Sequence, residues 1–251
     1  MCGRLFCLFN DKEELIDALS KDLDIKLDSN NFKYSASPKY NISPTSYLPV
    51  LTQIDRIESL HWGFKIFGLS QIVINARNEE IETKKSFKNL IDHDRCIVIC
   101  SGYYEWHTSN TKNTNTKSPY SFRPKNKPIC YLAALKHKET NSVVLMTREA
   151  VPTISHIHTR MPVLLRKDDI PKWLDNKETP FKDLKQTIIE NEFYTGKRKG
   201  STDFIEIEFT ALANYVNSVK VTGPECLQSL KEYKEKSFSQ GIGKFFPKAN
   251  K

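Results

Sequence analysis

The sequence lacks any long apolar stretch. The longest candidates, residues 97–100 and 143–146, have the length of single β-strands, whereas a membrane-spanning helix needs about 20 apolar residues. Glycine (9) and proline (12) are too scarce among 251 residues for a fibrous protein, and no internal repeat is visible. The first residues also lack the basic stretch and apolar segment of a signal peptide. We therefore expect a globular, intracellular protein without a membrane partner.

Cysteine is sparse as well. The six cysteines, at positions 2, 7, 96, 100, 130 and 226, do not form a disulfide framework, so we expect reduced thiols. Only strand-type residues separate Cys96 from Cys100, and no second pair lies nearby. Buried strand positions are therefore favoured over a zinc site, and we predict neither a metal nor another cofactor.

Basic residues modestly outnumber acidic ones. Lysine and arginine number 38 against 30 acidic residues, which gives a net charge of +8 and a pI near 9.0. Nucleic acid is a plausible partner for such a chain, although a surplus of lysine as often serves solubility.

Hydrophobic periodicity predicts an α+β fold. Residues 11–23 place Leu15 and Leu19 on one helical face, with Asn10 or Asp11 as the N-cap. Strand-like runs follow at 47–54, 72–75, 96–100, 129–135, 143–147, 161–165 and 204–209, and helical ones at 181–193 and 225–233. Regular βαβ alternation is absent, so we expect a single domain over residues 1–230, with a largely antiparallel β-sheet or barrel and peripheral helices. The polar residues 108–118 are expected to form a surface loop.

The second residue carries unusual chemistry. A small residue at this position normally permits removal of Met1, which leaves Cys2 with a free α-amine beside its thiol. Both groups ordinarily have pKa values of about 8, so both are partly available as nucleophiles near neutral pH. A 1,2-aminothiol condenses with an aldehyde to an imine and then closes to a thiazolidine ring. The alternative is that Cys2 is a small apolar residue at the start of a buried strand.

Three further motifs place polar side chains at predicted strand ends. In the sequence SGYYEW, Glu105 lies between aromatic residues, where desolvation raises a carboxyl pKa toward the range needed for proton transfer. A half-hidden structural glutamate gives the same pattern. His158 and Arg160 share one face of an extended segment, as an ordinary surface pair would. Asn75 and Arg77 offer an amide and a guanidinium suited to sugar and phosphate contacts.

Together and in this order, these motifs resemble the SRAP family, the SOS response-associated peptidases, which are understood as sensors of abasic sites in single-stranded DNA. The matching stretches are residues 1–4, 40–45, 62–63, 75–77, 95–96, 102–106, 132–135, 147, 158–162 and 216–218. The resemblance thus covers residues 2–230. Two differences are local: residues 99–101 (ICS) replace a usual Pro-Ala-polar stretch, and Ala134 replaces a usual glycine.

The resemblance implies a function. It implies that the chain binds single-stranded DNA and captures abasic sites as a thiazolidine crosslink through Cys2, which shields the lesion during replication. Asn75 would hold Cys2 and the lesion, Glu105 would act as acid and base, and His158 would assist at the sugar oxygen.

The resemblance also implies a DNA-binding surface. Arg4, Arg77 and Arg160 would grip phosphates beside the lesion. Trp62 would stack on a base, although it fits a core position equally well.

Two other functions remain open from the residues alone. One is an N-terminal-cysteine peptidase that uses Cys2 with Glu105 and His158, with its own Met1 as one candidate substrate. The other is a non-catalytic reader of modified bases or DNA ends.

The C-terminal residues carry a second motif. Residues 231–251 are rich in lysine and offer little for a core, so we expect a disordered basic tail. Within it, Ile242, Phe245 and Phe246 have the spacing of a sliding-clamp-binding peptide, with Ser239 where glutamine is usual. The alternative is that both phenylalanines pack on the domain itself. This motif and residues 197–199 (KRK) predict a nuclear location in a eukaryotic host.

Overall fold

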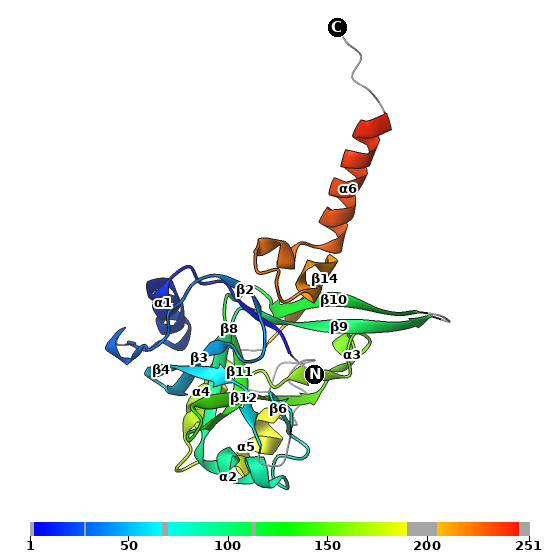
Figure 1. The fold of residues 1–251 in the computed structure, drawn as a ribbon. Coiled ribbons are helices and arrows are strands. Elements are labelled where there is room, and N and C mark those ends of the chain that lie inside the picture. Colours follow the sequence, from blue (N-terminus) through cyan, green and yellow to red (C-terminus); the bar gives the residue numbers. More distant parts are fainter. Residues whose placement is uncertain (1–2, 28, 67–69, 112–113, 190–204, 246–251) are drawn as a thin grey trace.

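The computed structural model describes residues 3–27, 29–66, 70–111, 114–189 and 205–245. Within these ranges it combines helices with mostly antiparallel sheets, which confirms the predicted α+β class (Figure 1). No helix in the same ranges is long and apolar enough to cross a bilayer.

The larger sheet closes on itself. Its strands are β3 (Tyr47–Gln53), β4 (Arg56–Trp62), β7 (Asn75–Arg77), β8 (Arg95–Cys100), β11 (Cys130–His137), β12 (Ser142–Glu149) and β13 (Arg160–Pro162). They follow the order β11-β8-β3-β4-β12-β13, β7 pairs with β12, and a further pairing of β11 with β12 completes a ring. Two pairings are parallel, those of β12 with β4 and with β7. The ring encloses much of the hydrophobic core, including Val98, Leu132 and Leu145.

Helices pack around this sheet. They are α1 (Lys12–Leu23), α2 (Lys85–His93), α3 (Pro152–Ser155), α4 (Ile170–Leu174) and α5 (Phe181–Leu184). The predicted first helix is confirmed: Asp11 caps it by accepting a 2.8 Å hydrogen bond from the Glu14 backbone N–H, and Leu15 and Leu19 are buried. The short strands β5 (Phe64–Lys65) and β6 (Ile72–Val73) form a separate pair.

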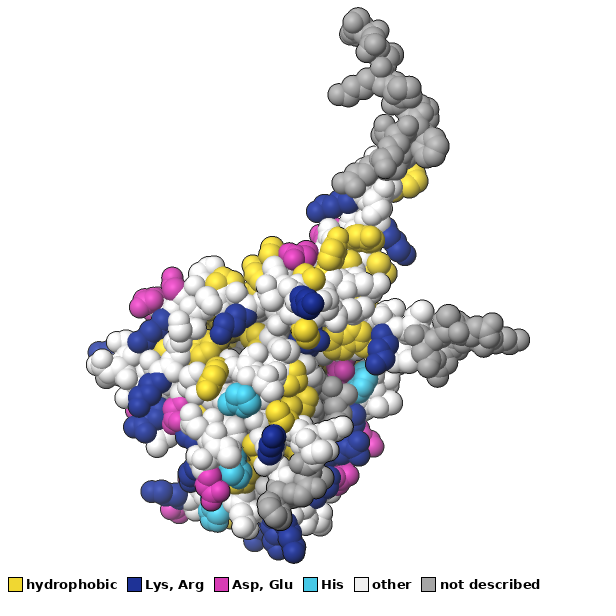
Figure 2. All heavy atoms as spheres, in the orientation of Figure 1, with side chains coloured by type: hydrophobic (Ala, Val, Ile, Leu, Met, Phe, Trp, Pro, Cys, Tyr) yellow, Lys and Arg dark blue, Asp and Glu magenta, His cyan; other side chains and the backbone are white. Residues whose placement is uncertain are grey.

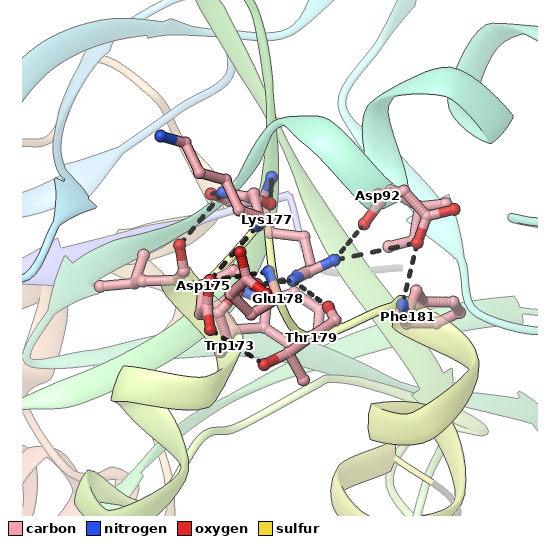
Figure 3. Close-up of polar contacts among 11 residues, drawn as sticks. Asp92, Trp173, Asp175, Lys177, Glu178, Thr179 and Phe181 are labelled. Carbon is pink, nitrogen blue, oxygen red and sulfur yellow. Dashed lines mark hydrogen bonds and ion pairs between the residues drawn. The ribbon is translucent and has the colours of Figure 1, made fainter.

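Arg95, the first residue of β8, fastens that strand to the helices beside it. Its buried guanidinium donates hydrogen bonds of 2.7–2.8 Å to the carbonyl oxygens of Ile91, Trp173, Asp175 and Thr179. Ile91 and Trp173 lie near the C-terminal ends of α2 and α4, where the helix dipole favours a cation. Figure 3 shows Trp173, Asp175 and Thr179 converging on this cluster. The N-terminal end of β8 is thereby fixed.

The second sheet carries the N-terminal strand in its interior. It has the order β14-β10-β9-β1-β2, in which β1 (Leu5–Cys7) lies between β9 (Gly102–Thr111) and β2 (Lys39–Ile42). The remaining strands are β10 (Thr114–Pro124) and β14 (Ile207–Ala211). Leu5, Phe6 and Cys7 are all buried, so the start of the described chain is held firmly in place.

Strands β9 and β10 form a long hairpin that stands out from the body (Figure 1). The prediction of a surface loop over residues 108–118 was therefore wrong. The segment pairs strand to strand from Thr111 opposite Thr114 back to Tyr103 opposite Phe122. The number of threonines in this segment explains the difference, because β-branched residues favour strands over loops.

The C-terminal segment also differs from expectation. Helix α6 (Leu230–Phe245) occupies much of the predicted disordered tail and extends away from the domain (Figure 1). A capping box starts it: the Ser229 hydroxyl accepts a 3.1 Å hydrogen bond from the Glu232 backbone N–H, while the Glu232 carboxylate accepts a 3.2 Å bond from the Ser229 N–H. Tyr233 makes an edge contact with Tyr215 at 5.9 Å between ring centroids, which ties the base of the helix to the domain.

Candidate functional site

The first residues of β9 place a buried carboxyl group on the smaller sheet. Gly102 starts the strand, and a Cβ there would lie 2.3 Å from both the Phe122 carbonyl oxygen and the Phe6 ring, so only glycine permits this close packing. Three residues later, Glu105 is 3 % exposed. Burial raises the pKa of Glu105 to about 7. A group that titrates there can give or take a proton at neutral pH.

His158 approaches Glu105 from the loop before β13. The His158 Nδ1 atom lies 3.7 Å from Glu105 Oε1 and 3.0 Å from the backbone N of Arg160, whose N–H can donate to it. Partial burial lowers the pKa of His158, so the imidazole is favoured in its neutral form at pH 7. The structure thus brings together two of the predicted catalytic side chains.

A cavity of about 490 Å³ opens over this pair. Its lining consists of Arg4, Glu105, Trp106, Thr108, Lys117, His158 and Asn217. The volume lies within the range of pockets that hold a ligand of drug size. Cationic and hydrogen-bonding groups surround one buried acid, which suits a polar, anionic ligand better than an apolar one.

Arg4, immediately before the N-terminal strand β1, lines the cavity and contacts three other residues. Its guanidinium donates to Asn41 Oδ1 at 2.5 Å and to the Val216 carbonyl at 3.0 Å, and its Cζ lies 5.6 Å from the centre of the Trp106 ring. The Trp106 indole N–H in turn donates to Asn217 at 2.6 Å. Arg4 therefore contributes a guanidinium group to the cavity lining, held in place by Asn41, Val216 and Trp106.

Asn41 and Asn217 are positioning residues that the sequence analysis did not single out. The Asn41 amide donates to the Ser218 and Val221 carbonyls at 2.9 and 2.6 Å, which anchors the Arg4 network to the C-terminal part of the domain. Both asparagines lie within stretches that carry the family resemblance, residues 40–45 and 216–218, which was the available signal.

Arg160 and Arg77 flank strand β12 close to His158. Arg160 makes a bidentate ion pair with Glu79, at 2.8 and 3.0 Å, and donates to the Thr147 carbonyl at 2.9 Å. Arg77 is opposite Thr147 in the parallel pairing of β7 with β12, and its side chain is 49 % exposed, 3.5 Å from Glu80. Both guanidiniums thus lie beside acidic residues, and a phosphate would compete with Glu79 for Arg160.

Asn75 starts β7, opposite Leu145 in the same pairing. The cavity lining around Glu105 does not include it among the described residues. Trp62 has no exposed surface, and its indole N–H donates to the Ile74 carbonyl at 3.1 Å. The structure therefore supports the core position for Trp62, and a stacking role on a DNA base does not fit.

Several predicted residues lie outside the described part of the chain: Cys2, residues 197–199 and Phe246. Ile242 and Phe245 fall within α6, and contact with a sliding clamp stays a prediction. No cluster of three His, Cys, Asp or Glu residues in the described ranges could hold a metal ion. Cys96 and Cys100 are buried in β8, and burial raises the pKa of each thiol.

Comparison with known proteins decides the family. The model for the SOS response associated peptidase (SRAP) family matches residues 1–203. The chain belongs to the SRAP family. Its expected family membership is thereby confirmed.

Relatives of this SRAP protein are found among both sequences and solved structures. It is 28 % identical over 246 residues to the abasic site processing protein YoqW of Bacillus subtilis, and the match covers 91 % of this chain and 100 % of the relative. The abasic site processing protein HMCES of Gallus gallus is 26 % identical, with 76 % of this chain and 66 % of that protein covered. The crystal structure of a phage-related protein from Bordetella bronchiseptica has the same fold, with a TM-score of 0.62, 23 % identity and coverage of 91 % of this chain and 99 % of that one.

Proposed function

We propose that this SRAP protein captures abasic sites in single-stranded DNA by forming a thiazolidine crosslink through Cys2. The observation that carries the proposal is the buried Glu105 carboxyl, whose pKa of about 7 suits proton transfer, beside His158 in a polar cavity. Names of relatives as abasic site processing proteins support the same target.

The start of the described chain lies at this cavity, which supports a role for Cys2. Arg4 lines the cavity, and its carbonyl accepts a 3.0 Å hydrogen bond from the Tyr104 N–H, immediately before Glu105. Two residues of chain span at most about 7 Å. A Cys2 N-terminus can therefore meet a ligand that also contacts Glu105.

The proposed reaction is a condensation followed by ring closure. After removal of Met1, the α-amine of Cys2 attacks C1′ of the ring-opened deoxyribose, and loss of one water gives an imine. The thiol sulfur then adds to the imine carbon, and the thiol proton moves to the nitrogen. At pH 7 Glu105 is populated in both its protonated and its carboxylate form. It can therefore protonate the departing hydroxyl and accept a proton in the reverse reaction.

The remaining predicted residues would hold the DNA. Neutral His158 would hydrogen-bond the sugar oxygen, and Asn75 would help position Cys2 and the lesion. Arg4 and Arg77 would contact phosphates, and Arg160 would do so if a phosphate displaces Glu79.

The test uses an abasic oligonucleotide and a denaturing gel. Wild-type protein should give a stable adduct, and Cys2→Ala should give none while still binding intact single-stranded DNA. Cys2→Ser keeps the amine, so borohydride should trap its imine although no stable adduct forms. Undiminished adduct in Cys2→Ala would overturn the proposal.

The same experiment separates the two other functions. A non-catalytic reader would bind abasic DNA without any adduct in the wild type. A peptidase would cleave a peptide substrate and leave abasic DNA unmodified. The mass of the mature N-terminus serves as the control, because the aminothiol exists only when Met1 has been removed.

A further inference from the structure

The projecting hairpin adds a second surface to the cavity. Two of the cavity-lining residues, Thr108 and Lys117, belong to the arm, which we define as residues 106–111 of β9 and 114–119 of β10. Figure 2 shows that basic, acidic and histidine side chains meet where the hairpin leaves the body. The cavity over Glu105 is therefore continuous with the base of the arm.

Thr108 and Lys117 form one unit. They are directly opposite each other in the antiparallel register of β9 and β10, and both side chains are exposed. Residues paired in this way project from the same face of the ribbon, with Cβ atoms about 5 Å apart. A hydroxyl and an ammonium at this separation can bind two oxygens of one phosphate.

The charge of Lys117 is available for such a ligand. Among the described residues no carboxylate pairs with it, whereas Arg160 is occupied by Glu79. The sequence from His107 to Arg123 contains no aspartate or glutamate at all, in a chain with 30 acidic residues. Thr116 and Ser118, also exposed, continue the set of uncharged hydrogen-bonding groups along the arm. This composition suits a polyanion, because no carboxylate of the arm would repel its backbone.

We propose that Thr108 and Lys117 bind the phosphate next to the abasic sugar and that the arm guides the strand out of the cavity. The assignment rests on the proposed function, since it presumes an abasic sugar at Glu105. It adds the path of the DNA strand: the sugar-phosphate backbone on one side of the lesion follows the hairpin. Contacts there are independent of base sequence.

The test measures binding to single strands that contain a tetrahydrofuran abasic analogue, which has no aldehyde and cannot crosslink. Lys117→Gln should flatten the dependence of log K on log salt by about 0.7, the value for one phosphate of a single strand. This corresponds to about 5-fold weaker binding at 0.1 M salt relative to 1 M. Thr108→Val keeps the β-branched shape, and should weaken binding without changing the salt slope.

Strand length gives a second readout. Lengthening the oligonucleotide on one side of the analogue should strengthen wild-type binding more than lengthening the other side, and the double variant Thr108→Val/Lys117→Gln should lose this asymmetry. The matched control is Lys172→Gln, an exposed lysine of α4 beside the start of β8, which should retain the wild-type slope.

The outcomes distinguish the two proposals. If wild-type protein forms the adduct with abasic DNA but Lys117→Gln keeps the full salt slope and the double variant keeps the length asymmetry, the arm does not carry the strand. If wild-type protein forms no adduct, the proposed function itself fails.

Discussion

At the scale of single residues, burial of the Glu105 carboxyl costs stability at neutral pH. Its pKa of about 7 in the folded protein exceeds the value of about 4.5 expected in the unfolded chain. The folded state therefore binds the Glu105 proton more tightly, and stability falls as pH rises from about 4.5 through 7. A neutral glutamine avoids this penalty while keeping the shape.

We predict that Glu105→Gln is more stable than wild type at pH 8, by on the order of 3 kcal/mol, and equally stable near pH 4. Urea unfolding across this pH range is the measurement. Glu139→Gln, which removes a charge from an exposed turn, is the control and should follow the wild-type curve. Parallel curves for wild type and Glu105→Gln would show that Glu105 titrates normally.

The same Glu105→Gln variant should also form the adduct with abasic DNA more slowly, by about 10²–10⁴-fold.

Glu79 sets the availability of Arg160. The bidentate ion pair holds the guanidinium between Glu79 and Thr147. We predict that Glu79→Gln strengthens binding to single-stranded DNA and steepens its salt dependence by up to one phosphate contact, about 0.7 in slope. Glu139→Gln changes the net charge equally and should leave the slope unchanged. An equal effect of both substitutions would mean that general charge, and not Arg160, is responsible.

At the scale of elements, the capping box of α6 is open to a direct test. Substitution of an N-cap serine by alanine typically costs about 1 kcal/mol. We predict that Ser229→Ala speeds amide hydrogen exchange in α6 about 5-fold while exchange in β8 is unaffected. Ser239 lies inside the same helix and donates to the Glu235 carbonyl, so Ser239→Ala should leave exchange equal or slower because alanine is the better helix former. Faster exchange in both variants would contradict the capping argument.

The elements also show what the sequence could and could not predict. The first helix was predictable because Asp11, Leu15 and Leu19 act within a few residues of one another. The shielding of Glu105 by aromatic neighbours was likewise local, and its burial agrees with that prediction. The hairpin was missed because polar composition was weighted above the β-branched pattern of its threonines. Trp62 could not be assigned from sequence, since its burial depends on strands far along the chain.

Long-range partners set the remaining features. Glu79 and Arg160 are 81 residues apart in the sequence. Similarly, Arg95 lies 78 residues from Trp173 and 84 residues from Thr179. No periodicity or motif encodes such pairs. The sequence therefore singled out candidate side chains for the chemistry, while the charge state and the partners of each depended on the assembled fold.

At the scale of the whole molecule, Arg95 links parts of the chain that are distant in sequence. Its substitution leaves two buried carbonyl oxygens, of Ile91 and Trp173, and two partly buried ones, of Asp175 and Thr179, without their donor. Since an unsatisfied buried group costs about 1–3 kcal/mol, the total loss is on the order of 3–5 kcal/mol. We predict that Arg95→Met lowers the free energy of unfolding by that amount and that Arg95→Lys rescues little, because one ammonium cannot span the four acceptors. Thermal unfolding is the measurement, with the exposed Arg56→Met as control. A loss below about 1 kcal/mol would show that water replaces the guanidinium.

The interior position of β1 has a consequence for biosynthesis. This strand is among the first segments to leave the ribosome, yet one of its two partners, β9, begins at residue 102. At about 5–20 residues per second, that delay is on the order of 5–20 seconds. During this time β1 cannot yet pair with β9, so the removal of Met1 that the proposed function requires would precede the pairing that brings Arg4 beside Tyr104 and Glu105. Under the proposed function, topology alone would place maturation before assembly, and a nascent chain would carry its aminothiol before the folded side chains that are proposed to use it.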